Sequence, residues 1–387
     1  MSTVTAIKQR RRGRKRGSIL QGFDPFLSVA VVGLLIIGTL LVYAATKNWY
    51  ATLGLDPEYY LKRHVINIFI GGLLALGATL IDYRLLRAYT PILWGVGVLG
   101  LTAVLIPGVG STVNGARAWI PLPGGFQIQP AELVKISIII GISVILSEGV
   151  HDREEPSNKI VVQALAIAAF PIFLILLQPD MGTVIIISSS VLTIIAVSGA
   201  SSRWVVGLLL VALLGGFTAV KVGVLSDYQV KRLQSFVNPL ADPQQSGYQL
   251  RQSRITVGSG GVLGKGLFNG PQTNGRFVPE QHTDFIFTVA GEELGFVGSS
   301  LILIFYLVVL LRGFRIARRS QDLFGRLICT GVISWFAFQA FENIGMTMGL
   351  MPMTGVPLPF VSYGGSSMFA NLIGIGLLQN IHARTRG

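Results

Sequence analysis

The sequence has few charged residues and almost no cysteine. Only 13% of its 387 residues are charged, and Cys329 is its one cysteine. A single cysteine excludes an intrachain disulfide and a cysteine metal cluster. Hydrophobic residues make up 51% of the chain, and they come in continuous runs of about 20 rather than at amphipathic spacing. This pattern predicts an all-α, polytopic integral membrane protein.

Acidic residues are scarcer than basic ones, with 18 Asp and Glu against 31 Lys and Arg. Such an excess could indicate nucleic-acid binding. However, seven basic residues lie between Lys8 and Arg16, and most of the others flank apolar runs, where membrane topology accounts for them. These seven residues form a basic N-terminal head, which precedes a full-length apolar run without a small-residue cleavage site. We therefore expect no cleaved signal peptide. We predict a basic tail at 1–22, one transmembrane domain at 23–387, and no nucleic acid partner.

Apolar segments in the sequence predict ten membrane-spanning helices. They cover Pro25–Ala45, Tyr59–Ile81, Leu85–Leu105, Ala131–Leu146, Lys159–Leu177, Thr183–Val197, Trp204–Val222, Phe285–Leu311, Leu323–Met346 and Ser366–Ile381. Ten crossings place both termini on one side, and the basic head and short basic loops of that side indicate the cytoplasm. The large polar insert at about 225–284, between the seventh and eighth helices, is then extracytoplasmic.

The insert has the composition of an ordered surface segment. Residues 228–236 and 248–255 mix aromatic, aliphatic and basic side chains, which is typical of short helices on a membrane surface. The glycine-rich run at 258–266 does not match a P-loop, because Ser259 stands at a glycine position and Gly266 at a Ser or Thr position.

Basic residues outnumber acidic ones in the insert, which suits a pyrophosphate or an anionic headgroup. Arg251, Arg254 and Lys265 are therefore candidates for substrate binding. Each could equally belong to a solvated helix face.

Charged side chains at membrane depth cost a few kcal/mol each, so they are usually paired and often functional. Glu132 and Lys135 lie one turn apart near the outer end of the fourth helix, where they could form an internal ion pair or line a polar cavity. Asp180 follows a helix-breaking Pro179 and could simply cap a turn. Asp284 could likewise cap the eighth helix.

Convergence favours function over capping. Glu132, Asp180 and Asp284 come from three separate segments, yet each is predicted at the outer end of a helix. Glu292, two turns beyond Asp284, would fall on nearly the same helical face but deeper, and Glu342 could face the same interior. We therefore predict a polar site at the outer membrane face, with Asp284 as its principal acid.

The stretch at 349–367 contains too many glycines and prolines for a continuous helix. Irregular backbone at membrane depth persists only where it lines protein or a water-filled cavity. We expect a re-entrant wall on the outer side, with an ordinary loop as the alternative.

Four motifs, in this order, resemble the SEDS family of bacterial membrane proteins, which includes RodA, FtsW and SpoVE. They cover Gln129–Lys135, Gln178–Thr183, His282–Gly295 and Pro352–Ser367. The resemblance extends over nearly the whole chain after the basic head, and the insert is most similar to the RodA branch. Ala131 stands where the family usually has serine.

The resemblance implies a peptidoglycan glycosyltransferase that polymerises lipid II at the outer face of the bacterial cytoplasmic membrane, for elongation in the case of a RodA-like protein. It also implies a single-pass class B penicillin-binding transpeptidase as partner. By motif match, the catalytic acid falls on Asp284, while Glu132 and Lys135 match a functionally important pair.

Further candidates for substrate binding are Arg117, Ser362 and Ser366. A divalent cation such as Mg²⁺ or Mn²⁺ could stabilise a departing diphosphate, although the sequence shows no fixed ligand set for a metal.

Two other functions fit parts of the pattern. A lipid II flippase would use the intramembrane charges as its pathway, but it favours a midplane site and internal repeats, whereas the polar motifs here crowd toward one face without a repeat. A non-catalytic scaffold for wall synthesis predicts that Asp284 is replaceable.

Overall fold

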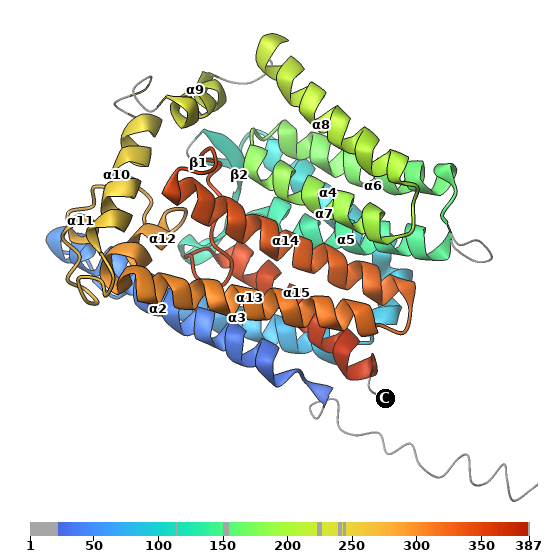
Figure 1. The fold of residues 1–387 in the computed structure, drawn as a ribbon, viewed down its shortest axis with the longest axis horizontal. Coiled ribbons are helices and arrows are strands. Elements are labelled where there is room, and N and C mark those ends of the chain that lie inside the picture. Colours follow the sequence, from blue (N-terminus) through green and yellow to red (C-terminus); the bar gives the residue numbers. More distant parts are fainter. Residues whose placement is uncertain are drawn as a thin grey trace, which may run out of the picture.

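The computed structural model describes residues 22–113, 115–149, 155–222, 227–238, 242 and 245–385. The predicted basic tail lies outside this part of the chain, except for Gly22. The loop residue Arg153 and the turn residue Pro239 also lie outside it. Long helices run side by side, the short elements of the insert gather at one end of the bundle, and the C-terminus lies at the other (Figure 1). We call these the Asp284 end and the Asp24 end.

A helix occupies each of the ten predicted ranges. The helices are α2 (Pro25–Thr52), α3 (Tyr59–Leu80), α4 (Leu86–Leu105), α5 (Pro130–Glu148), α6 (Asn158–Leu176), α7 (Met181–Val197), α8 (Ser202–Val222), α12 (Ile286–Val289) continued by η4 (Ala290–Leu294) and α13 (Gly295–Arg319), α14 (Leu323–Met348) and α15 (Gly365–Thr385). Within the described residues, eight helical segments are long and apolar enough to cross a membrane, and α7 is a shorter apolar helix. The all-α membrane fold is confirmed, and the number of crossings stays a prediction.

Short elements connect the helices at the Asp284 end. A small antiparallel sheet of β1 (Ser111–Val113), β2 (Ala116–Pro121) and β3 (Gln127–Ile128) joins α4 to α5. This sheet was not expected, because strands this short leave no readable alternation in the sequence. The insert contributes α9 (Asp227–Val237), α10 (Ser246–Ser259) and α11 (Pro271–Asn274).

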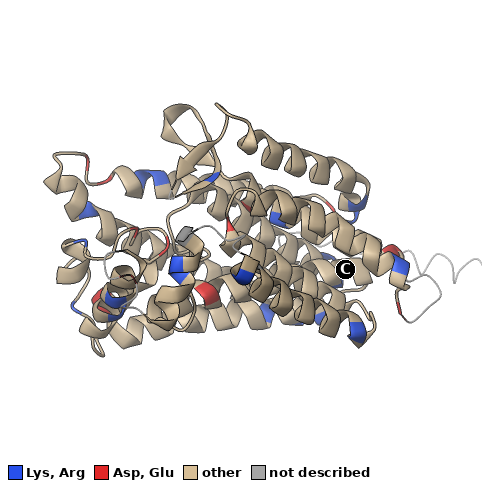
Figure 2. Cartoon of the chain, turned by 90° about the horizontal axis from the view of Figure 1, so that it is seen from above, with Lys and Arg blue, Asp and Glu red and all other residues tan. Residues whose placement is uncertain are grey.

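The core lies around α5 and α14, which bury 72% and 67% of their most apolar stretch, whereas α8 buries none of its own. Helix α5 contacts α4, α6, α7, α14 and α15. Leucines and valines exposed on α3 and α8 are the surface expected of helices that face lipid rather than water. Long stretches of helix carry no charged residue (Figure 2).

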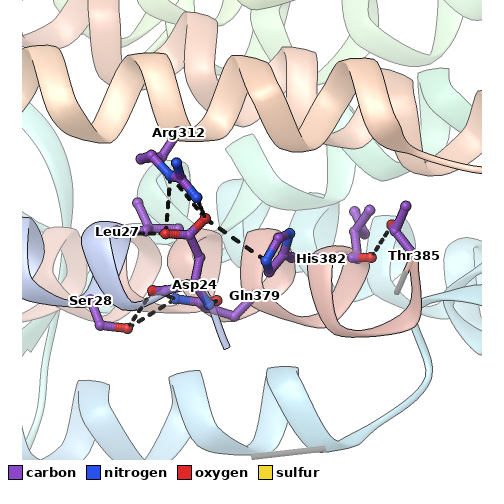
Figure 3. Close-up of polar contacts among 8 residues, drawn as sticks. Asp24, Leu27, Ser28, Arg312, Gln379, His382 and Thr385 are labelled. Atoms are coloured by element: carbon purple, nitrogen blue, oxygen red, sulfur yellow. Dashed lines mark hydrogen bonds and ion pairs between the residues drawn. The ribbon is translucent and has the colours of Figure 1, made fainter. Parts of the chain in front are cut away.

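A buried ionic cluster closes the Asp24 end. Asp24 caps α2 by accepting a hydrogen bond from Leu27 N at 3.0 Å, and it pairs with Arg312 of α13. From α15, Gln379 accepts a hydrogen bond from Asp24 N at 2.8 Å, and His382 Nε2 lies 3.8 Å from the Asp24 carboxylate (Figure 3). Burial alone would raise the pKa of Asp24, but the hydrogen bonds from Arg312 and Leu27 hold it below its ordinary value. The cluster fastens the first and last long helices to α13.

Candidate functional site

Glu132 and Lys135 form the expected ion pair on α5. Lys135 Nζ lies 2.9 Å from Glu132 Oε2, and both side chains are almost fully buried. Lys135 also donates a 3.2 Å hydrogen bond to Gln339 and lies 4.6 Å above the Trp335 ring. Because an unpaired charge here would be costly, this network fixes the lysine ammonium in one position inside the bundle.

Asp180 both caps a helix and joins this polar region. Its carboxylate accepts hydrogen bonds from Thr183 N at 3.1 Å and Thr183 Oγ1 at 2.8 Å, as an N-cap does. Gln129 Nε2 donates to the same carboxylate at 2.9 Å. The pKa of Asp180 is raised, chiefly by burial. The hydrogen bonds from Thr183 lower it, the Glu132 charge raises it and the Lys135 charge lowers it. The capped-turn alternative is therefore confirmed, and the bond from Gln129 joins this cap to the segment before α5, while a polar cavity lined by Asp180 stays a prediction.

The irregular segment between α14 and α15 anchors the backbone around Asp284. Ser362 Oγ donates to Thr283 O. From α14, Asn343 Nδ2 donates 2.7 Å hydrogen bonds to both Asp284 O and Val356 O. Residues 350–364 contain no helix, as predicted, and their polar groups hold Asp284 in place.

The Asp284 carboxylate is half-buried and does not cap a helix. The N-cap of α12 is Phe285, which lies beyond Asp284, and no side chain accepts a capping hydrogen bond there. Asp284 Oδ2 lies 3.3 Å, and Arg232 Nη1 3.5 Å, from the point that a Cβ on Gly355 would occupy. Gly355 has a φ of 77°. The helix-cap alternative for Asp284 is therefore wrong, and the absence of a side chain at Gly355 lets an acid and an arginine approach one point.

Burial raises the pKa of Asp284 to about 7, and the neighbouring Glu280 and Asp180 carboxylates act in the same direction while Arg232 opposes them. A carboxyl that titrates near neutral pH can hold or release a proton under working conditions.

Two further glutamates have different surroundings. Glu342 of α14 is fully buried, lies next to Thr354, and feels the charge of Asp180, so it does face the same interior. Glu292 instead accepts hydrogen bonds from Gln272 N at 2.8 Å and Thr273 N at 2.7 Å. The expectation that Glu292 shares a face with Asp284 assumed a continuous α-helix, but Ala290–Leu294 is a π-helix. Glu292 anchors the insert.

The candidate substrate-binding residues are distributed over several structural roles. Arg117 donates to Ile106 O at 3.0 Å and holds the segment after α4, and Arg254 donates to Gly349 O at 3.0 Å. Ser366 Oγ accepts a 2.8 Å hydrogen bond from Gln129 N, a structural role like that of Ser362. Arg251 and Lys265 are exposed on the insert.

The arginine that the structure brings to Asp284 is Arg232, which was not singled out from the basic residues of the insert. It also donates to Met353 O at 3.3 Å. A signal was present: on α9, Gln229, Arg232 and Ser235 are spaced three apart and are half-buried or buried, whereas Lys231 is exposed. This amphipathic spacing marks Arg232 as an inward-facing cation.

A divalent cation has no ready-made site in the described part of the chain, where no group of three or more His, Cys, Asp or Glu side chains could hold a metal. Asp180 is already bonded to Thr183 and Gln129. A cation held jointly by the protein and a bound diphosphate stays a prediction.

Comparisons with known proteins agree with the motifs. A family model that joins FtsW, RodA and SpoVE, described as cell cycle protein, matches residues 26–387. Stage V sporulation protein E of Bacillus subtilis is 38% identical over 363 residues, covering 94% of this chain and 98% of the relative. Peptidoglycan glycosyltransferase MrdB of Escherichia coli is 36% identical and covers 91% and 93%. A chain in a solved structure that concerns polymerization and crosslinking by a peptidoglycan synthase complex superposes with a TM-score of 0.77 at 30% identity, covering 94% of this chain and 98% of that chain.

Proposed function

The chain belongs to the FtsW, RodA and SpoVE family, and from this we propose that it is a peptidoglycan glycosyltransferase that polymerises lipid II. The observation that carries the mechanism is the Asp284 carboxylate, half-buried, with a pKa of about 7, beside Arg232 at Gly355. The curated relative MrdB bears this activity in its name. Its similarity and the RodA-like insert support a role in cell elongation.

In the proposed reaction, Asp284 accepts the proton of the acceptor sugar 4-hydroxyl. The hydroxyl oxygen attacks the anomeric carbon of the donor, and the bond from that carbon to the undecaprenyl diphosphate oxygen breaks. One displacement converts an α-linked donor into a β-1,4 product. A positioned base contributes about 10² to 10⁴ in rate, and the pKa of about 7 keeps much of Asp284 ionised at neutral pH while leaving it basic enough to take the proton.

Negative charge develops on the diphosphate as it leaves, and fixed cations stabilise such charge. Arg232 is half-buried and held by Met353 O, and its charge acts on Asp284. Lys135 is also a fixed cation, but it is paired with Glu132 and almost fully buried, so Arg232 is the cation that we assign to the leaving diphosphate. A divalent cation bound with the diphosphate would supply the same kind of stabilisation.

The proposed orientation has both termini in the cytoplasm and the Asp284 end outside, in the bacterial cytoplasmic membrane. The last turn of α13, at the Asp24 end, carries Arg318 and Arg319, and the next helix begins with Arg326 in its first turn. Clustered basic residues at this end support the assignment by the positive-inside rule.

The proposed partner is a class B penicillin-binding transpeptidase with a single transmembrane helix. An apolar groove of about 300 Å³ lies between α13 and α14, and we place the transmembrane helix of the partner against this face, where close side-chain packing holds membrane helices together. Its lining includes Leu303, Leu307, Leu310, Ala337, Phe341 and Ile344. Leu307→Trp should fill the groove and abolish co-purification of the transpeptidase, whereas Leu209→Trp on the exposed surface of α8 should not. Equal recovery with both variants would contradict this location.

The function is tested with purified full-length protein, its transpeptidase partner and fluorescent lipid II. Wild type should produce glycan strands, and Asp284→Asn should produce none while eluting as a folded protein. Asp56→Asn is the control, because Asp56 lies at the same end but is exposed. Normal strands from Asp284→Asn would contradict the general-base role. Lipid II translocation in liposomes that survives Asp284→Asn, but is lost in a Glu132→Gln protein that still elutes as folded, would favour a flippase.

A further inference from the structure

A group of aromatic rings lies beside Asp284, and the proposed mechanism does not use it. We call it the mouth cluster, and it consists of Trp49, Tyr50, Tyr59, Tyr60, His282 and Tyr363. The rings come from the end of α2, the start of α3, the segment before α12 and the segment before α15. Chain segments far apart in the sequence thus converge on one spot at the Asp284 end.

The rings are in mutual contact rather than scattered. Tyr60 lies at the centre, with its ring centroid 4.6 Å from His282, 4.8 Å from Tyr363 and 5.1 Å from Tyr50. Trp49 packs edge-to-face on Tyr50 at 4.9 Å. Trp49, Tyr50, Tyr59, Tyr60 and Tyr363 are each half-buried, whereas His282 is buried beneath them.

The mouth cluster adjoins the reacting groups. His282 precedes Asp284 by two residues, and Tyr363 N donates a 3.0 Å hydrogen bond to His282 O. The Glu280 carboxylate acts electrostatically on both Tyr60 and Asp284. The cluster is therefore tied to the chain segment that carries the candidate base.

An ordinary interfacial belt does not account for these contacts. Belt tyrosines and tryptophans are anchored at headgroup level around the whole protein, whereas these rings pack on one another and on two arginines. The Arg276 guanidinium lies 3.5 Å from the centre of the Trp49 ring, and Arg63 lies 4.4 Å from that of Tyr59. Arg63 also donates to the backbone oxygens of Gly124 and Gly125. The arginines thus add fixed hydrogen-bond donors to the rim of the cluster.

Two buried polar side chains of α3 near the cluster have polar atoms that lack a hydrogen-bond partner among the described residues. His64 is fully buried, its ring lies 6.2 Å from Tyr363, and neither of its nitrogens has a hydrogen-bond partner among the described residues. Asn67 Oδ1, one turn further along α3, is also buried and unpartnered there. Such groups are costly to leave unpaired, so they add unused hydrogen-bonding capacity on the α3 side of the cluster.

We propose that the mouth cluster is a saccharide-binding subsite, which takes the pyranose rings of the glycan that Asp284 extends. Aromatic rings present flat apolar surface that matches the C–H face of a pyranose, and their polar edges together with arginine donors match its hydroxyl and acetamido groups. The subsite rests on the proposed function, because it names where that substrate lies. The bound sugar comes either from the growing strand or from the disaccharide of lipid II.

Binding is measured without catalysis, using the full-length Asp284→Asn protein in nanodiscs and a fluorescent, lipid-free oligosaccharide of alternating N-acetylglucosamine and N-acetylmuramic acid. Fluorescence anisotropy gives the dissociation constant. When Trp49→Leu and Tyr60→Leu are introduced together into the Asp284→Asn protein, the dissociation constant should rise by about tenfold or more, because two ring contacts are lost. Tyr60→Phe keeps the ring and shows whether the site still folds. Phe173→Leu removes an exposed ring of α6 outside the mouth cluster and should change binding less than about twofold.

The subsite would be overturned if all variants bound the oligosaccharide with equal affinity, or if the Asp284→Asn protein did not bind it. It would also be overturned if Phe173→Leu weakened binding as much as the double substitution does. These results do not depend on polymerisation, so they separate failure of the subsite from failure of the proposed function, which a wild-type protein inactive on lipid II would show.

A polymerisation assay of the double variant with Asp284 intact then separates the two sources of sugar. Shorter strands at an unchanged half-saturating lipid II concentration indicate the growing strand, and a raised half-saturating concentration indicates the lipid II disaccharide. Wild-type strand length together with an unchanged half-saturating concentration would also overturn the proposal.

Discussion

Lys135 Nζ lies 2.9 Å from Glu132 Oε2 in an interior where the two side chains are only 2% and 4% exposed. In such surroundings the ion pair is held by more than mutual attraction, because Gln339 accepts a hydrogen bond from the lysine and Trp335 lies beneath it. Removing one partner leaves the other charge buried and uncompensated, which is more costly than removing both.

Single neutralisation of this pair should therefore destabilise the protein more than double neutralisation. Lys135→Met or Glu132→Gln alone should each lower the free energy of unfolding by about 3–5 kcal/mol, and the double variant by clearly less. Thermal unfolding in one detergent measures this. If the double variant lost as much free energy of unfolding as the two single variants together, the two residues would act independently. Glu132 would then have no role in positioning Lys135.

The pH dependence of polymerisation should follow the ionisation of Asp284. Its pKa is about 7, and the base acts in its ionised form, so activity should rise as the pH increases through about 7 and then level off. Initial rates at low lipid II concentration, measured from pH 5.5 to 8.5, give the midpoint.

Two substitutions should move that midpoint in opposite directions. Glu280→Gln removes a negative charge that raises the pKa of Asp284, so the midpoint should shift to lower pH. Arg232→Gln removes the charge that lowers it, so the midpoint should shift to higher pH. If the midpoint moved in the same direction in both variants, or in neither, the pH–rate profile would report the ionisation of another group.

Gly355→Ala should reduce activity more than its effect on stability explains. The new Cβ would stand 3.3 Å from Asp284 Oδ2 and 3.5 Å from Arg232 Nη1, at a backbone φ of 77°. The positive φ alone costs about 1–2 kcal/mol for alanine. Gly54→Ala is the matched control, since Gly54 has a φ of 68° and open space around its Cβ position. Both variants should melt at lower temperature, and only Gly355→Ala should lose polymerisation; equal activity would place Gly355 outside the site.

Asp24→Asn should loosen the Asp24 end of the bundle. Folding lowers the pKa of Asp24 below its ordinary value of 3.8, so its ionised form stabilises the folded state at pH values above 3.8, and this contribution is lost as the pH falls through the folded value. The wild-type melting temperature should therefore fall more steeply than that of Asp24→Asn as the solution is acidified below pH 4. Asp82→Asn, in the more exposed pair with Arg384, should have a smaller effect at neutral pH.

Several features of the site could be predicted from local sequence alone. An i, i+3 spacing brings Glu132 and Lys135 to one side of a helix whatever surrounds them. The change from an apolar run to polar motifs places Asp180 and Asp284 at helix ends. The glycines and prolines of 349–367 exclude a continuous helix there. Each prediction depends on neighbours within a few residues, which is why the structure agrees with it.

The sequence by itself determined that the chain forms apolar helices long enough for a membrane, and which acids stand at their ends. Only the tertiary structure decided that α5 and α14 are central, because helices that face lipid and helices that face protein overlap in hydropathy. It also decided that Arg232 and Asp284 meet at Gly355, and that Asp284 is not a helix cap. Those contacts join residues far apart in the chain, and helical periodicity records which residues share a face but not which faces meet.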